Sequence, residues 1–302
     1  MEIFRGSGVA LVMPFDKDEN IDYAALDKLI NFHLDNGTDA LIINGTTGES
    51  STLSDEEKSQ ALDYVIKKVN KKIPVIAGTG TNNTKHAVKL SIEAEKLGAD
   101  ALLVVTPYYN KGNESGIYDY YKKIANSVEI PIILYVVPSR TGVNLSIKLL
   151  KKLAEIKNIV AIKDATGNLS YTAQIAHDVP KLDIYSGNDD VVLPVMSLGG
   201  KGVISVSANI IPKDTHNMVQ YFLDGNITEA TRLQLGKLKL LNTLFIEVNP
   251  VPVKEALNIL GINVGPCRSP LGSMDEENKN KFDTLNRRLH LRIGHRYCLL
   301  LQ

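Results

Sequence analysis

Eight apolar runs of six residues alternate with longer amphipathic stretches, and this alternation constrains the fold more than any other feature of the chain. Between the first runs, residues 22–36, 55–70 and 83–97 carry apolar side chains at three- and four-residue spacing, which is typical of amphipathic helices. Strands that alternate with helices predict a parallel sheet with crossover helices. The eight runs are GVALVM (8–13), DALIIN (39–44), IPVIAG (73–78), DALLVV (100–105), IPIILY (130–135), IVAIKD (159–164), LDIYSG (182–187) and GVISVS (202–207).

Eight strand–helix units within about 225 residues favour a closed barrel, because an open sheet needs a switch point in its strand order and usually has fewer strands. The expected class is therefore α/β, with a catalytic (β/α)8 TIM barrel over residues 1–224. After residue 224 the pattern is helical only, with helices expected over 228–247, 252–260 and from 275 onward. Residues 225–302 are therefore predicted to form a C-terminal helical extension.

The charge balance and the cysteines exclude several kinds of partner. The 34 basic and 34 acidic residues cancel, so we expect no nucleic acid and no anionic membrane as partner, and a small molecule is favoured. No apolar stretch reaches membrane length, and the N-terminal one, broken by Pro14, is too short for a signal peptide. Cys267 and Cys298 are far apart and follow no metal or redox spacing. These features predict a soluble protein of the reducing cytoplasm.

Neither a metal nor a cofactor is predicted. The six histidines show no HExxH or similar spacing. The glycine-rich stretch GTGTNN (78–83) lacks both the dinucleotide fingerprint and a Walker lysine, so it predicts no nucleotide.

Polar residues follow most of the apolar runs, at the point where each strand is expected to end. Because the active site of such a barrel forms at the carboxyl ends of its strands, these residues should converge on one rim. Hydroxyls, an arginine and a lysine are among them. The segments concerned are GTTGES (45–50), TPYYNKG (106–112), Tyr135 with VVPSRTG (136–142), Lys163, and SGNDD (186–190).

Lys163 ends the buried run NIVAIK, where an ammonium is least tolerated. Burial disfavours the charged form and makes the neutral amine available, and a neutral amine attacks carbonyls. The functional interpretation is a Schiff-base nucleophile. The alternative is a lysine that pairs with Asp164 or extends to the rim. Successive strand residues point to opposite faces, so Asp164 should point away from Lys163 and is a poor partner.

The GTTGES loop offers free backbone N–H groups and hydroxyls, which suit a carboxylate or a phosphate. An ordinary strand-to-helix turn is the alternative, because the loop runs into a capping box at Ser54–Glu57.

Tyrosines and an arginine on the same rim have equally open interpretations. Tyr108, Tyr109 and Tyr135 could pass protons beside an imine, although most tyrosines are packing residues. Arg140 could clamp a substrate carboxylate with two hydrogen bonds, or it could be a surface arginine without a partner. The pair Asp189-Asp190 is interpreted as a helix cap rather than as acid and base or metal ligands.

Taken together, the rim segments resemble the dihydrodipicolinate synthase / N-acetylneuraminate lyase family of class I aldolases. GTTGES, TPYYN, YxVPSRTG, AIKDATGN, SGND and GVISV occur in family order, and the resemblance runs from about Gly6 to Met274. It implies a (β/α)8 barrel with C-terminal helices, a homotetramer built from two tight dimers, and no organic cofactor.

The resemblance also implies roles for the catalytic residues. Lys163 matches the lysine that forms an imine with pyruvate, and Tyr135 would donate and accept protons beside it. Thr46 would link Tyr135 to Tyr109, which in this family reaches across the tight dimer into the neighbouring site. Thr47, with the backbone of its loop, would hold the pyruvate carboxylate, and the pocket would be lined by Gly187 and Ile204.

Arg140 separates the branches of the family, because synthases use an arginine in this turn to bind the carboxylate of aspartate semialdehyde, whereas the lyases typically have an uncharged residue. The resemblance therefore implies condensation of pyruvate with L-aspartate 4-semialdehyde to 4-hydroxy-tetrahydrodipicolinate, the entry to diaminopimelate and lysine synthesis. One alternative is a neuraminate lyase or a 2-keto-3-deoxy-sugar acid aldolase on the same scaffold. Another is a catalytically silent barrel that acts as a binding or scaffold protein.

The sequence departs from the family pattern at two places. Val136 stands where most synthases have asparagine, which removes an amide that could hydrogen-bond the nearby backbone. From about Lys281 the sequence does not resemble the family's closing helix, so it is either a divergent helix or a frame-shifted or artificially added tail.

The positive charge of Lys58 predicts weak or absent inhibition by lysine. Lys58 would stand where lysine-inhibited relatives receive their cationic ligand at the dimer interface. The matching positions are Ser51, Asp55, Lys58, Asn82, His86 and Tyr108.

Overall fold

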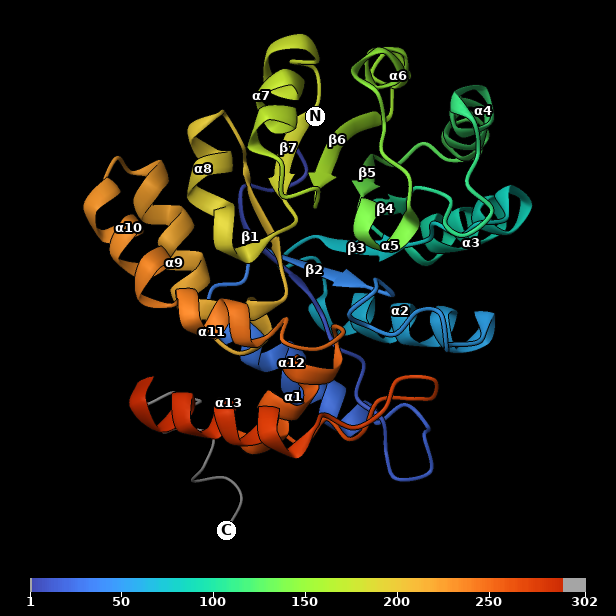
Figure 1. Ribbon diagram of the computed structural model, residues 1–302. Helices are drawn as coiled ribbons and strands as arrows, with labels where there is room; N and C mark the ends of the chain where they lie inside the picture. Colours follow the sequence, from blue (N-terminus) through green and yellow to red (C-terminus); the bar gives the residue numbers. More distant parts are fainter. Residues whose placement is uncertain (1, 290–302) are drawn as a thin grey trace.

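The computed structural model describes residues 2–289, which form a closed barrel of parallel strands surrounded by helices (Figure 1). Each strand pairs with its neighbours in sequence, and β8 pairs with β1 to close the sheet. The predicted α/β TIM barrel is therefore confirmed. Its strands are β1 (Gly6–Ala10), β2 (Ala40–Ile43), β3 (Val75–Gly78), β4 (Ala101–Val105), β5 (Ile132–Val136), β6 (Ile159–Asp164), β7 (Asp183–Ser186) and β8 (Gly202–Ser205).

Helices follow the strands, and several of them begin at capping side chains that can be recognised in the sequence. Asp22 and Asn83 accept backbone N–H groups at the starts of α1 and α3, and Ser54 and Glu57 form the predicted capping box of α2. The helices of the barrel are α1 (Tyr23–Asp35), α2 (Asp55–Val69), α3 (Thr84–Leu97), α4 (Glu114–Ala125), α5 (Pro138–Thr141), α6 (Ile147–Leu153), α7 (Leu169–Asp178), α8 (Val192–Ser197) and α9 (Pro212–Leu223), with 3-10 turns η1 (Asp189–Val191) and η2 (Ser207–Asn209).

The first strand begins earlier than predicted, at Gly6 instead of residue 8. A Cβ on Gly202 would lie 1.9 Å from the carbonyl oxygen of Gly6, so a glycine at 202 permits the close approach that closes the barrel. Residues 11–13 remain buried, but the chain leaves the sheet after the Leu11 N–H, which donates to the Ile42 carbonyl, and the backbone N–H of Val12 donates to the Asn209 side chain. The prediction followed the buried apolar run, which is longer than the segment that pairs with other strands.

Alternate side chains of each strand belong to two separate apolar clusters. On β2, Ala40 and Ile42 belong to the cluster inside the barrel, whereas Leu41 and Ile43 face the surrounding helices. This alternation decides which residues at a strand end can meet at the centre of the rim.

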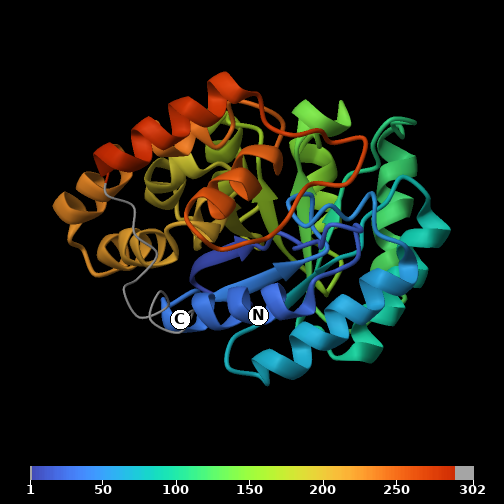
Figure 2. The ribbon, with the colours of Figure 1, turned by 90° about the horizontal axis from the view of Figure 1, so that it is seen from below.

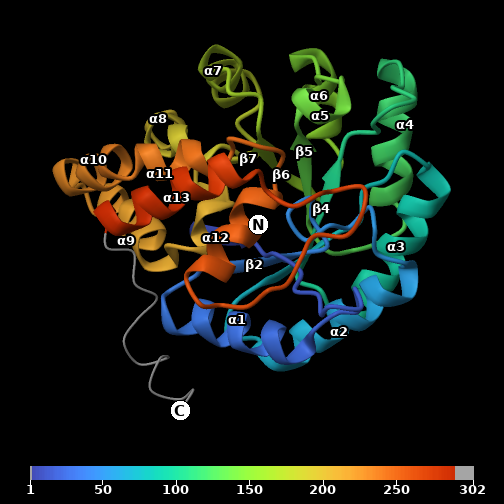
Figure 3. The same ribbon diagram turned by 60° about the horizontal axis from the view of Figure 1, so that its bottom comes forward.

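The C-terminal extension packs on the barrel and shares its outer cluster, to which Leu240, Val253 and Phe282 contribute. The single helix predicted over 228–247 is instead two helices that meet at Lys237 and end at Thr243. Figures 2 and 3 show α11, α12 and α13 grouped together beside the barrel. The extension comprises α10 (Ile227–Gly236), α11 (Leu238–Thr243), α12 (Val251–Ile259) and α13 (Glu276–Leu289).

A buried ion pair fastens the extension to the loop after β2. Lys254 Nζ lies 2.8 Å from Glu49 Oε1, and the two side chains are 2% and 0% exposed. The backbone N–H of Arg268 donates to the other carboxylate oxygen of Glu49 at 2.8 Å. Burial lowers the pKa of Lys254, and its ammonium lies 4.4 Å from the centroid of the Phe15 ring. The loop is therefore held from the extension as well as from the barrel.

Replacing Lys254 with methionine should destabilise the protein, because it leaves the Glu49 carboxylate buried without its cation. We expect the free energy of unfolding, measured by urea titration and circular dichroism, to fall by about 3–5 kcal/mol. The matched control is Lys181→Met, which breaks the exposed pair with Glu155 and should cost less than about 1 kcal/mol. Equal losses in the two variants would contradict the anchoring role of the buried pair.

Candidate active site

A cavity of about 380 Å³ opens at the carboxyl ends of the strands, a size that suits a small metabolite. Barrel residues form its floor, and residues of the extension between α11 and α12 complete its wall. Six of the eight residues predicted from the sequence line it: Thr46, Thr47, Tyr135, Arg140, Lys163 and Gly187.

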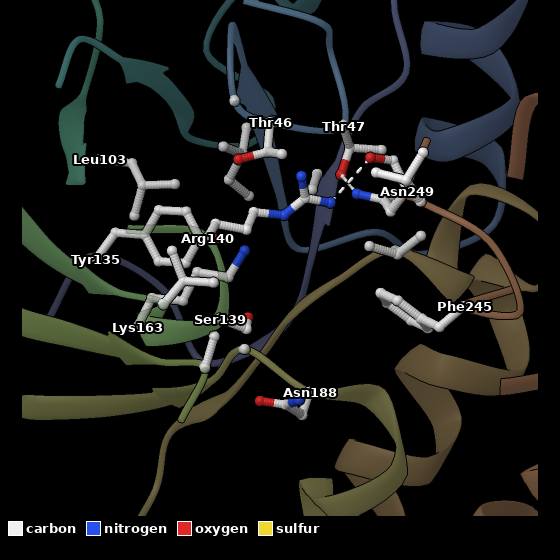
Figure 4. Close-up of a pocket in the computed structure, with 18 of the residues that line it drawn as sticks. Thr46, Thr47, Leu103, Tyr135, Ser139, Arg140, Lys163, Asn188, Phe245 and Asn249 are labelled. Atoms are coloured by element: carbon white, nitrogen blue, oxygen red, sulfur yellow. Dashed lines mark hydrogen bonds between the residues drawn. The ribbon is translucent and has the colours of Figure 1, made fainter. Parts of the chain in front are cut away.

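Lys163 lies at the end of β6 and is only 5% exposed, with its amine 4.4 Å from the centroid of the Tyr135 ring (Figure 4). The two residues are direct neighbours across β5 and β6. Asp164 points to the other face, where it accepts hydrogen bonds from the Thr166 and Thr172 hydroxyls at 2.6 and 2.7 Å. Within residues 2–289, Lys163 has no ion-pair partner. The amine is therefore available to a ligand's carbonyl group.

The loop after β2 presents two threonines to the cavity. A tight turn shapes the loop: the N–H groups of Gly48 and Glu49 donate to the carbonyls of Gly45 and Thr46, each at 3.1 Å. Thr47 is 2% exposed, and its hydroxyl oxygen accepts a hydrogen bond from Asn249 at 3.0 Å. Thr46 lines the same cavity as Tyr135, but no hydrogen bond joins the two in the described part of the chain. The predicted relay through Thr46 therefore stays a prediction.

Arg140 reaches the cavity from the short helix α5. One guanidinium nitrogen donates to the backbone carbonyl of Asn249 at 2.9 Å. Figure 4 shows the side chain extended toward Thr47 and Asn249. Arg140 is an exposed residue without an ion-pair partner among the described side chains, so its remaining N–H groups can receive a ligand's carboxylate.

Two predicted residues lie elsewhere in this chain. Tyr109 has a positive φ of 68° and is 90% exposed on the rim, outside the cavity. Ile204 is fully buried in the inner cluster and does not line the cavity, where Val206 lies instead. Gly187 does line it, and a methyl group there would come within 2.6 Å of the Ala165 side chain.

The interpretation of Asp189 as a cap of its own helix is wrong. Its buried carboxylate accepts the backbone N–H groups of Val206 and Ser207, at 3.0 and 2.9 Å, and so ties the loop after β7 to the end of β8. Burial raises the pKa of this carboxyl group, and these hydrogen bonds oppose the increase. Among residues 2–289, no cluster of three or more His, Cys, Asp or Glu side chains could hold a metal ion.

Sequence reasoning missed the part of the wall that comes from the extension. Phe245, Glu247, Val248 and Asn249 line the cavity although they follow the barrel in sequence. The two closely spaced prolines in Asn-Pro-Val-Pro, which interrupt the helical pattern, were the available signal of a loop.

The fold and the site together define a TIM-barrel enzyme whose cavity is built around an unpaired lysine. The dihydrodipicolinate synthetase family matches residues 3–288. A 4-hydroxy-tetrahydrodipicolinate synthase of Brachyspira hyodysenteriae is 55% identical over 279 residues, covering 92% of this chain and 95% of the relative. The chain belongs to this family. It has 4-hydroxy-tetrahydrodipicolinate synthase activity, in lysine biosynthesis.

Solved structures show the same similarity. The chloride-inhibited dihydrodipicolinate synthase of Acinetobacter baumannii, complexed with pyruvate, is 43% identical with a TM-score of 0.93, covering 96% of this chain and 100% of that one. The enzyme of Cyanidioschyzon merolae, with lysine bound, is 39% identical at the same TM-score and coverage.

The first departure from the family pattern, Val136, lies outside the cavity wall. The Val136 side chain belongs to the outer cluster and is fully buried, so the expected asparagine amide would face the helices rather than the cavity. The family match extends to residue 288 and α13 to Leu289, which supports the interpretation of a divergent helix over this part. Residues 290–302 lie outside the described residues. No described helix combines the length and apolar character needed to span a membrane.

Proposed function

We propose that this site condenses pyruvate with L-aspartate 4-semialdehyde, in the cytoplasm, through an imine on Lys163. The observation that carries the proposal is the unpaired Lys163 amine in a cavity whose wall also presents Arg140 and Thr47. The relative complexed with pyruvate supports the first substrate. No organic cofactor and no metal ion enter the proposed reaction.

Lys163 begins the reaction by attacking the C2 carbonyl of pyruvate, and water leaves as the imine forms. The imine accepts electrons, so C3 loses a proton and becomes the nucleophilic carbon of an enamine. This carbon attacks the aldehyde of the second substrate, and the new alkoxide takes up a proton. The amine of the condensed product then attacks the imine carbon, closes the ring and releases Lys163.

Tyr135 is the proposed proton donor and acceptor, because its ring lies against the Lys163 amine. Thr46 and Tyr109 are proposed to relay these protons. Tyr109 lies outside the cavity of its own chain, which agrees with a role in a neighbouring subunit. We therefore propose a tight dimer that exchanges Tyr109 residues, assembled further into a homotetramer.

The two substrate carboxylates are proposed to bind at different places. Thr47 and the backbone of its loop would hold the pyruvate carboxylate beside Lys163, within the wall formed by Gly187. Arg140, which is exposed whereas Thr47 and Lys163 are buried, would hold the carboxylate of the semialdehyde. This separation places the aldehyde between the enamine and the arginine.

Borohydride reduction in the presence of pyruvate tests the imine. Mass spectrometry should find a covalent pyruvate adduct on Lys163 and none on Lys254, the buried lysine that Glu49 holds. Lys163→Ala should abolish the adduct and the activity without unfolding the barrel, whereas Lys181→Ala at the surface should change neither. An active Lys163→Ala variant would overturn the assignment of the nucleophile.

Arg140→Ala tests the second substrate. The loss of a charge-assisted hydrogen bond should raise the KM for L-aspartate 4-semialdehyde about ten- to hundredfold, while pyruvate trapping remains close to that of the wild type. The exposed Arg232→Ala serves as the control. Preferred turnover of sugar aldehydes by the wild type, in the same product assay, would favour the sugar-acid aldolase alternative instead.

At the proposed regulatory site, the Asp55 carboxylate already has partners from the chain itself. Lys89 Nζ and His86 Nε2 each lie 2.8 Å from an oxygen of Asp55, and these hydrogen bonds lower the pKa of Asp55 to about 2. Lys58 adds a further cation nearby in sequence. A lysine ligand would meet like charges here, in contrast to the relative that has lysine bound.

Activity should therefore persist when L-lysine is added at sub-millimolar concentration. Lys58→Ala should increase the sensitivity to lysine, and Lys67→Ala, on the exposed face of the same helix, should not. Strong inhibition of the wild type at sub-millimolar lysine would contradict the proposal.

A further inference from the structure

We infer that Asn249, in the C-terminal extension, is a positioning residue for both substrates: its side chain orients the Thr47 hydroxyl, and its backbone carbonyl anchors Arg140. The inference rests on the proposed roles of Thr47 and Arg140. It adds a residue that touches both carboxylate-binding groups from a part of the chain outside the barrel.

Asn249 makes two short contacts, of which the one to Thr47 is buried and the one to Arg140 is partly buried. Its side-chain amide nitrogen donates to Thr47 Oγ1 at 3.0 Å, and its carbonyl oxygen accepts from Arg140 at 2.9 Å (Figure 4). Asn249 is 5% exposed and Thr47 is 2% exposed. Solvent therefore cannot easily replace the amide as a partner of this hydroxyl.

The direction of the hydrogen bond decides what Thr47 can offer to a ligand. A threonine hydroxyl has one proton to donate and two lone pairs to accept with. The amide N–H of Asn249 fills one lone pair and cannot accept the proton. The hydroxyl proton is therefore left for an acceptor in the cavity, and a carboxylate is the strongest acceptor that a substrate of this site carries.

The surrounding structure holds Asn249 in place at two points. Asn249 lies two residues before the first residue of α12, and Lys254 of that helix pairs with Glu49, two residues after Thr47. The loop after β2 and the start of α12 are thus joined by both the Thr47–Asn249 bond and the Glu49–Lys254 pair. Small movements of the loop relative to the extension are resisted by both.

Asn249→Asp is the sharpest test, because it keeps the size of the side chain but replaces the donor with an acceptor. The carboxylate would accept a hydrogen bond from the Thr47 hydroxyl, which would then no longer donate to the ligand, and it would repel the pyruvate carboxylate. We expect the pyruvate concentration that gives half-maximal borohydride trapping to rise about ten- to hundredfold. In the neutral Asn249→Ala variant the KM for L-aspartate 4-semialdehyde should change by less than about threefold, because that substitution spares the carbonyl that anchors Arg140 and adds no charge beside it.

A pH series separates this role from a general structural one. When the introduced carboxyl group is protonated, it can again donate to Thr47. The pyruvate dependence of Asn249→Asp should therefore improve toward that of the wild type as the pH falls, whereas a merely distorted site would not recover. If the aspartate variant fails to fold, the neutral Asn249→Ala should still raise the half-saturating pyruvate concentration, by about three- to tenfold.

Asn258→Asp is the matched control in the same extension. The Asn258 amide donates to the carbonyl of Gly265 at 3.1 Å and its oxygen accepts from the N–H of Val264 at 2.8 Å, away from the cavity. This variant should lose stability while its pyruvate dependence stays that of the wild type. An equal change in pyruvate dependence for the two variants would overturn the inference.

A double-mutant cycle with Thr47→Val tests whether Asn249 acts through Thr47. In the valine background Asn249→Asp should have much less effect on pyruvate trapping than in the wild type, because the hydroxyl it redirects is gone. Additive effects, or an unchanged pyruvate dependence in a folded Asn249→Asp variant, would overturn the inference. Absence of any adduct in the wild type would instead contradict the proposed imine chemistry.

Discussion

Pairing of β8 with β1 is the constraint on which the rest of this structure depends. The register places Ser7 beside Val203 and Gly8 beside Ile204, so the sheet has no free edge and an enclosed interior. Closure brings the carboxyl ends of all eight strands to one rim. It also gives every strand an inner and an outer face. A lysine at the inner end of a strand is then enclosed by the other strands, whereas in an open sheet the same position could face solvent.

Where two neighbouring residues of a strand point to opposite faces, the inward side chain contributes to the cavity and the outward side chain supports the surrounding structure. Lys163 and Tyr135 face inward, where no carboxylate of the described chain pairs with the amine. Their neighbours Asp164 and Val136 face outward, where Asp164 fixes the following loop through Thr166 and Val136 fills the outer cluster. An acidic group can therefore stand next to the amine in sequence without neutralising it in space. The same alternation keeps the Val136 side chain out of the cavity wall.

The sequence predicted the features that depend on local pattern. Buried parallel strands are continuous apolar runs, and the residue that follows each run identifies the rim, so Lys163 and Arg140 could be placed before the structure was known. Asn249 could not be placed in this way, because its hydrogen bond to Thr47 joins residues 202 positions apart. Asp189 was misinterpreted for the same reason, since its partners Val206 and Ser207 lie just after the following strand. The predicted first strand was too long because Val12 and Met13 are buried without pairing to a neighbouring strand.

The barrel and the extension differ in their sequence patterns, but residues of both line the cavity. A loop with two glycines, such as residues 45–50, has many accessible conformations, and ordering it costs conformational entropy. The Glu49–Lys254 pair and the Thr47–Asn249 bond both fix this loop from the extension, and both are buried, where partners left unpaired are costly. The geometry of the loop at 45–50 thus depends on residues that follow the last strand by more than forty positions. A barrel that ended at α9 would keep Lys163 but would lack these contacts to Thr47 and Arg140.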